Sequence, residues 1–138
     1  MLRKLFFLAV IIVMCVAFYR QILEKAQMYV DKHSQSESAP QLQYYIGDVY
    51  FISRDFVSAE KAYRLVKKNY PNSFYASRAQ YSIARIYEEQ DNYIRAKAEY
   101  DDFVKNYPQD GFVRKAKNKL EILNLFKEQV PNPDKTKE

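Results

Sequence analysis

The sequence predicts an all-α protein, in which an N-terminal transmembrane helix (residues 1–32) precedes a short solenoid of helical hairpins (residues 40–129). Three observations support this prediction. Glycine is scarce, with 2 residues in 138, and a low glycine content with many charged residues is typical of helices. The segment that begins at Gln43 is nearly repeated from Gln80 onward, so the chain contains an internal repeat. Within each copy, apolar residues recur at intervals of three and four, which is the spacing of one helix face.

The first element is a membrane segment. Residues 5–19 are apolar and follow two cations, Arg3 and Lys4, with Arg20 at the far end. A helix over this run is about 22 Å long, shorter than the roughly 30 Å hydrocarbon core of a bilayer. Flanking basic side chains and an interfacial tyrosine extend the reach of such a helix.

Three interpretations of this segment stay open. The favoured one is an uncleaved single-pass anchor, because helix-forming residues continue the apolar run to about Lys32. A cleaved signal peptide has the right charged and apolar regions, but Cys15–Ala17 is a poor cleavage site. A lipoprotein would be lipidated at Cys15, where Met14 occupies a position that normally holds a small residue.

The rest of the chain divides into a linker, two hairpins, a cap and a tail. Polar, serine-rich residues 33–39 have the composition of a linker. The apolar pattern predicts two antiparallel helices over each of the segments 40–71 and 77–108, with breaks near positions 54, 71, 91 and 108. Residues 112–129 predict a last helix with one apolar face and no partner helix, which we interpret as a cap. Two prolines and a charged end predict a disordered tail over residues 130–138.

Individual residues support the hairpin interpretation. Asp55 and Asn92 stand where each second helix begins and are N-cap candidates. Ala59 and Ala96 are small residues at the positions where two helices must cross closely. A proline then ends each second helix, because proline cannot continue the hydrogen-bond ladder.

This pattern resembles the tetratricopeptide repeat. The family's Leu-Gly-x-x-Tyr, Ala, Phe and Pro positions fall on Ile46, Gly47, Tyr50, Ala59, Tyr63 and Pro71, and then on Ile83, Ala84, Tyr87, Ala96, Tyr100 and Pro108. The sequence departs from the family at two positions of each unit. Gln43 and Gln80 replace its tryptophan, and Arg54 and Asp91 replace the glycine of the inter-helix turn. We expect a strained turn, particularly at Arg54, because only glycine adopts positive φ freely.

The junction between the units is similar to the bacterial envelope branch of this family. That branch includes outer-membrane-assembly lipoproteins and the periplasmic partner of the Tol–Pal system. The resemblance implies a non-catalytic, membrane-tethered protein–protein interaction scaffold, an accessory subunit or recruiter in an envelope complex. The resemblance also implies a single-pass protein of the bacterial inner membrane, and the basic N-terminus favours the orientation in which the C-terminal domain faces the periplasm. The alternative is a cleaved or lipidated periplasmic outer-membrane assembly factor.

In this family the first helices of the repeats line a concave, partner-binding face. The candidate partner-binding residues are Gln41, Tyr44, Asp48, Phe51, Arg78, Tyr81, Arg85, Glu88, Lys115 and Asn118. Tyr44 and Tyr81 match between the repeats, and we favour packing over peptide stacking for both. We interpret Asp48, Arg85 and Glu88 as plain solvated charges. The carboxylate clamp of chaperone-binding members is disfavoured, because Tyr44 and Asp48 occupy two of its positions.

The sequence offers no visible chemistry. Cys15 and His33 are the single cysteine and the single histidine, so no ligand set for a metal is apparent. There is no phosphate-binding loop and no nucleophile motif, and we expect neither an enzyme, nor a cofactor, nor a small-molecule substrate. The net charge is +5, and residues of both signs are interspersed along the chain. This distribution argues against nucleic-acid binding.

We expect protein partners, a larger membrane complex or a second copy of the chain. The outer flank of the first hairpin (Tyr45, Val49 and Ile52) has no preceding repeat to cover it. Short repeat arrays need such cover, because three units are normally the minimum for a continuous core. A partner, a second copy or the helix over residues 20–32 is expected to lie there.

Overall fold

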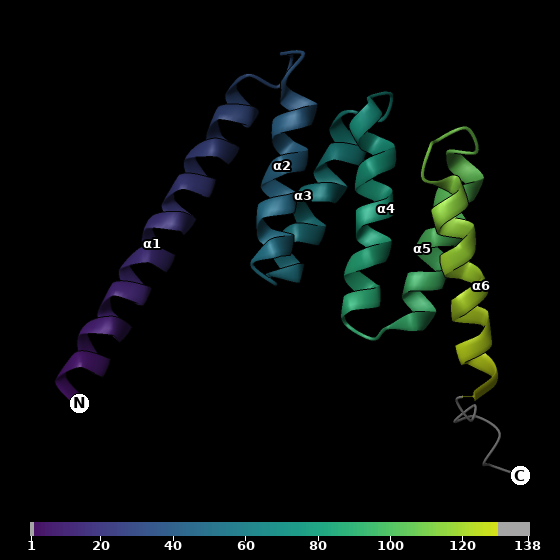
Figure 1. Ribbon diagram of the computed structural model, residues 1–138. Helices are drawn as coiled ribbons and strands as arrows, with labels where there is room; N and C mark the ends of the chain where they lie inside the picture. Colours follow the sequence, from purple (N-terminus) through teal and green to yellow (C-terminus); the bar gives the residue numbers. More distant parts are fainter. Residues whose placement is uncertain (1, 130–138) are drawn as a thin grey trace, which may run out of the picture.

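The computed structural model describes residues 2–129, and over that range the chain consists of helices and turns without a strand. The helices are α1 (Leu2–Lys32), α2 (Ala39–Ile52), α3 (Phe56–Asn69), α4 (Phe74–Glu89), α5 (Tyr93–Asn106) and α6 (Val113–Gln129). Consecutive helices pack against one another along the array (Figure 1). The all-α repeat prediction is confirmed for these residues, and the breaks expected near 54, 71, 91 and 108 fall between consecutive helices.

The same turn closes both hairpins. The backbone N–H groups of Arg54 and Asp55 donate to carbonyls of the preceding helical turn at 3.0 Å, and those of Asp91 and Asn92 repeat both bonds. Arg54 and Asp91 lie in the left-handed region, with φ of 60° and 56°, as this type of helix end requires. Both turns therefore carry a residue with positive φ, and the expected strain is larger at Arg54, because the short polar side chain of Asp91 is better tolerated in this region. The side chains of Asp55 and Asn92 cap the next helix, each accepting a backbone N–H three residues further on, at 3.1 and 3.2 Å.

The core lies where α2, α4 and α6 pack against α3 and α5. Ala59 and Ala96 are fully buried, which agrees with their assignment to the crossing points. Tyr63 is also buried, and its ring lies against Gly47, so close that a Cβ at that position would be 2.6 Å from two ring atoms. Equivalent residues thus fill equivalent places in the two hairpins.

The second half of α1 covers the outer flank of the first hairpin. Leu23 and Val30 of α1 are buried in one cluster with Ala39 and Ile46, and Val49 packs against the same cluster. Residues 33–38 turn the chain back, so that α1 and α2 run antiparallel (Figure 1). The chain's own helix therefore covers part of this flank, while Tyr45 and Ile52 stay exposed.

A pair of amides fixes the register of α1 on α2. Gln27 and Gln43 exchange two hydrogen bonds, of 2.9 and 3.0 Å, between their side chains. Gln43 is almost fully buried, so both its polar atoms need partners. The glutamine that replaces the family's tryptophan therefore has a structural role in attaching α1.

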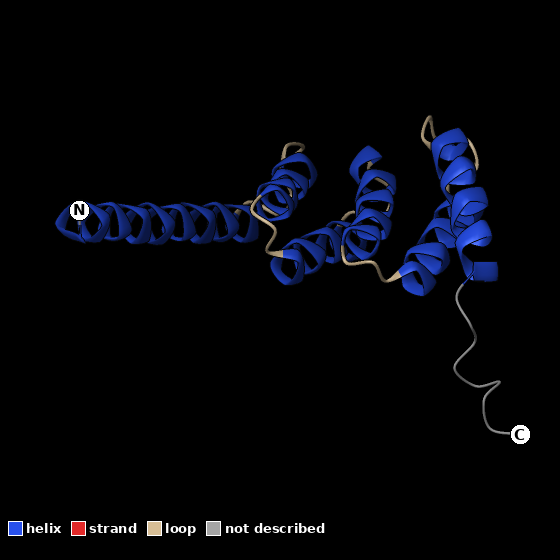
Figure 2. Cartoon of the chain, turned by 60° about the horizontal axis from the view of Figure 1, so that its bottom comes forward, coloured by secondary structure: helices blue, strands red, loops and turns tan. Residues whose placement is uncertain are grey.

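The first half of α1 projects beyond the repeats (Figure 2). Among the residues that the structure describes, no helix is long and apolar enough to cross a membrane. The transmembrane span expected over residues 5–19 is therefore not supported by the structure. The apolar run is short, and the charged residues Arg20, Glu24 and Lys25 follow it in the same helix. The tail expected over residues 130–138 lies outside the described residues.

Candidate partner-binding face

The first helices of the hairpins and the cap form one layer of the array. Figure 1 shows α2, α4 and α6 in front of α3 and α5, and Figure 2 shows the same two layers from another side. The ten candidate residues all lie on these three front helices. Arg85, Lys115 and Asn118 are exposed, Tyr81 is buried, and the half-buried ones are Gln41, Tyr44, Asp48, Phe51, Arg78 and Glu88.

The two matching tyrosines pack inside the array. The ring of Tyr81 lies 4.9–5.5 Å from three aromatic rings of α5 and the turn before α6. The ring of Tyr44 lies 5.4 Å from that of Tyr63, and its hydroxyl shares a 3.2 Å hydrogen bond with Ser82 of the next repeat. These contacts favour packing over ligand stacking for both tyrosines.

The two acidic residues of the face already have partners. The Tyr63 hydroxyl donates to Asp48 Oδ1 at 2.6 Å, and the Tyr100 hydroxyl donates to Glu88 Oε2 at 2.8 Å. Burial raises the pKa of Asp48 above its ordinary value of 3.8, although the Tyr63 hydrogen bond acts in the opposite direction. Glu88 is also paired with Lys119. The interpretation of these two carboxylates as plain solvated charges is wrong, because each is tied to a buried phenol.

Three cations of the face, Arg78, Arg85 and Lys115, form no ion pair with an acidic side chain among the described residues. The guanidinium of Arg85 lies 4.6 Å from the ring centroid of Phe51. That of Arg78 lies between two phenylalanine rings, at 3.9 and 4.6 Å, and its buried Nε has no hydrogen-bond partner. Lys115 Nζ lies 5.1 Å from the Phe112 ring, which also contacts Arg78. Stacking of this kind attracts a cation to the ring face and restricts its motion.

The charges of the face are therefore unequal in availability. The carboxylates accept hydrogen bonds from internal donors, while Arg85 and Lys115 are exposed and held beside aromatic rings. A planar guanidinium fixed in this way binds carboxylates with two parallel hydrogen bonds. The arrangement suits an acidic ligand.

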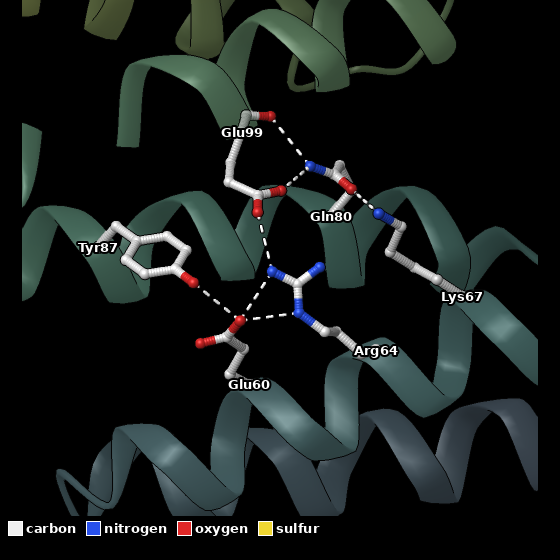
Figure 3. Close-up of polar contacts among 6 residues, drawn as sticks. All are labelled: Glu60, Arg64, Lys67, Gln80, Tyr87 and Glu99. Carbon is white, nitrogen blue, oxygen red and sulfur yellow. Dashed lines mark hydrogen bonds and ion pairs between the residues drawn. The ribbon is translucent and has the colours of Figure 1, made fainter. Parts of the chain in front are cut away.

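A polar network that the sequence pattern does not predict joins the two repeats behind this face. Figure 3 shows Arg64 of α3, which lies 2.7 Å from Glu60 and 3.0 Å from Glu99 of α5. Gln80 of α4 donates to the Glu99 carboxylate at 2.6 Å and to its backbone oxygen at 3.0 Å. The Tyr87 hydroxyl donates to Glu60 at 2.8 Å. Three helices are thereby linked, which fixes the angle between the repeats and hence the shape of the face.

Comparison with known proteins supports the repeat assignment. The sequence matches the tetratricopeptide repeat twice, over residues 41–73 and 78–110. A search of curated proteins finds no match, so no relative supports the resemblance to the bacterial envelope branch. The two matches correspond to the hairpins α2–α3 and α4–α5, with their shared turns and equivalent core residues. The chain therefore contains two tetratricopeptide repeats, with α1 and α6 packed at the two ends of the pair.

Proposed function

We propose that the protein is a non-catalytic interaction module that binds an acidic segment of a partner protein on the face of α2, α4 and α6. The observation that supports this proposal is the set of cations Arg78, Arg85 and Lys115, which are stacked on rings and have no ion pair among the described residues. Tetratricopeptide repeats present such a face to protein partners.

The energetics favour charge recognition by this face. The stacked side chains have already lost part of their rotational freedom, so less entropy is lost when a ligand binds. Hydrogen bonds between guanidinium and carboxylate are stronger than those between neutral groups. Because the face is open to solvent, the attraction weakens with added salt.

The proposal includes attachment to a membrane through residues 5–19. Arg3 and Lys4 before the apolar run favour a single-pass anchor with a cytoplasmic N-terminus, and the resemblance to the envelope branch suggests the bacterial inner membrane, with the repeats facing the periplasm. There the protein would act as an accessory subunit or recruiter in an envelope complex. The alternative, a cleaved or lipidated periplasmic assembly factor, predicts a different intact mass. A chain that begins at Phe18, or at a diacylated Cys15, would favour that alternative.

Affinity capture from native membranes tests the binding face. The full chain in mild detergent is compared with an Arg85→Glu/Lys115→Glu variant, in which both changed residues are exposed. The matched control is Lys61→Glu/Lys68→Glu, which makes the same change of charge at exposed positions of α3. We expect the first variant to lose its partners in mass spectrometry and the control to keep them. Equal recovery with both variants would contradict the proposal.

A defined probe tests the chemistry. Binding of a fluorescent peptide rich in Glu and Asp is measured by anisotropy at increasing salt concentration. We expect the peptide to bind the original chain more weakly as the salt concentration rises. The Arg85→Glu/Lys115→Glu variant should not bind it. An uncharged peptide of equal length is the control, and equally tight binding of it would contradict recognition by charge.

A further inference from the structure

Exposed apolar side chains collect on one edge of the repeat array. Ile52, Val57 and Ile94 are 79, 80 and 84% exposed. Val57 and Ile94 are equivalent, because each is the second residue of the helix that follows an inter-helix turn. Ile52 ends α2 just before the first turn. We name these three residues the turn edge.

The turn edge lies where α1 leaves the array. The Tyr19 hydroxyl donates to the Val49 carbonyl at 3.2 Å and shares a 2.7 Å hydrogen bond with Ser53 in the first turn. The N-terminal part of α1 projects beyond the repeats (Figure 2). The first turn therefore stands level with the end of the apolar run over residues 5–19. In Figure 1 the second turn, between α4 and α5, points to the same lower side as the N-terminal end of α1.

We propose that the turn edge rests on the surface of a lipid bilayer and inserts Ile52, Val57 and Ile94 into its interfacial region. This inference depends on the membrane attachment proposed above. If residues 5–19 lie in the bilayer, the continuous helix α1 brings the first turn to the bilayer surface. Apolar side chains there are removed from water at the boundary between headgroups and acyl chains.

The charged groups of this edge are compatible with such a contact. Arg20 and Arg95 are exposed, so these two cations can reach phosphate groups. The nearby acids are occupied. Glu89 lies 3.3 Å from Arg54, and Asp91 accepts a hydrogen bond from the Tyr93 hydroxyl at 2.7 Å. Lipid phosphates would therefore meet the cations Arg20 and Arg95, while the Arg54–Glu89 pair adds no net charge and Asp91 keeps its charge.

A bilayer at this edge leaves the partner-binding face open. The face is formed by the sides of α2, α4 and α6, whereas the turn edge lies at the end of α2 and at the starts of α3 and α5 (Figure 1). The proposed contact would hold the helices upright on the surface, and a partner would approach parallel to the membrane.

Fluorescence quenching tests the contact, because the chain contains no tryptophan. Full chains carrying Val57→Trp, Ile94→Trp or Phe74→Trp are reconstituted into phosphatidylcholine vesicles, with or without lipids brominated on their acyl chains. Phe74 is the matched control, because it is 62% exposed but begins α4 at the opposite edge of the array. We expect bromine to reduce the emission of the first two variants and to leave that of Phe74→Trp unchanged.

Flotation of the same vesicles separates the possible failures. If the chain floats with the vesicles but Val57→Trp and Ile94→Trp are quenched no more than Phe74→Trp, the turn edge does not contact lipid, while the attachment stands. If the chain does not float, the proposed attachment is wrong, and the inference is overturned with it. Quenching confined to one of the two turns would also overturn the inference, because it requires both turns at the surface.

Discussion

Replacing Gly47 with alanine should destabilise the repeat domain, because the added methyl group has no space. A Cβ at this position would lie 2.6 Å from Cδ1 and from Cε1 of Tyr63, where ordinary contacts begin at 3.4 Å. The ring cannot move away easily. Tyr63 is 1% exposed, its hydroxyl is bonded to Asp48 at 2.6 Å, and its ring lies 5.4 Å from that of Tyr44.

Two opposing effects set the size of the change. Alanine in place of glycine inside a helix is favourable by about 0.5–1 kcal/mol. Overpacking a core costs about 1–3 kcal/mol. We expect Gly47→Ala in the upper part of that range, because the Tyr63 ring is held by its hydrogen bond to Asp48 and by its contact with Tyr44. We expect a net loss of about 1–2 kcal/mol, and each kcal/mol lowers Tm by roughly 4–8 °C in a domain of this size.

The assay is thermal and urea unfolding of the full chain in mild detergent, followed by far-UV circular dichroism. The chain's other glycine supplies the control, because a Cβ at Gly111 would meet no heavy atom within 4 Å. Gly111→Ala should therefore change the stability by no more than about 0.5–1 kcal/mol, and in the stabilising direction. If Gly47→Ala proved as stable as the original chain, the packing of Tyr63 against α2 would be wrongly described.

Three further changes test other parts of the structure. Ala96→Leu should destabilise the fold by roughly 1–3 kcal/mol, because Ala96 is fully buried. Ala98→Leu, at an exposed position, should change the stability by about 0.5 kcal/mol or less. Equal melting temperatures of the two variants would contradict the assigned register. Arg54→Gly should stabilise the chain by about 0.5–1 kcal/mol in urea unfolding, because it relieves a positive φ, and a loss would count against strain in the turn. Burial raises the pKa of Asp48 above its ordinary value of 3.8. At a pH between the unfolded and the folded pKa, the folded chain keeps a proton that the unfolded chain has lost. The stability therefore falls as the pH rises from the lower to the higher of these two values. Asp48→Asn keeps an acceptor for Tyr63 and should reduce the dependence of the urea unfolding midpoint on pH in this range. An unchanged dependence would mean that another group causes it.

The backbone of the repeats was predictable because it follows from local signals. Helix periodicity, the capping residues Asp55 and Asn92, and the small residues Ala59 and Ala96 each act over a few positions. They recur in both units, so each unit supports the interpretation of the other. The strained turns were also predictable, because a non-glycine residue at the position of Arg54 has to adopt positive φ.

The charges of the binding face were not predictable, because their state depends on residues distant in the sequence. Tyr63 and Tyr100 are equivalent, yet they donate to Asp48 and to Glu88, which are not equivalent positions. The position equivalent to Asp48 holds Arg85. The phenol contact has thus moved by one helical turn, which leaves a cation on the face, and periodicity alone carries no sign of that exchange.

The attachment of α1 connects the proposals for the membrane and for the binding face. A flexible tether would let the repeats rotate freely above a bilayer. Here α1 is one continuous helix from Leu2 to Lys32, and its second half is fixed to α2 by Leu23, Val30 and the amide pair of Gln27 with Gln43. If its first half lies in the bilayer, the position of the repeats follows from the direction of that helix. The orientation of the cationic face would then be set by packing, before any partner binds.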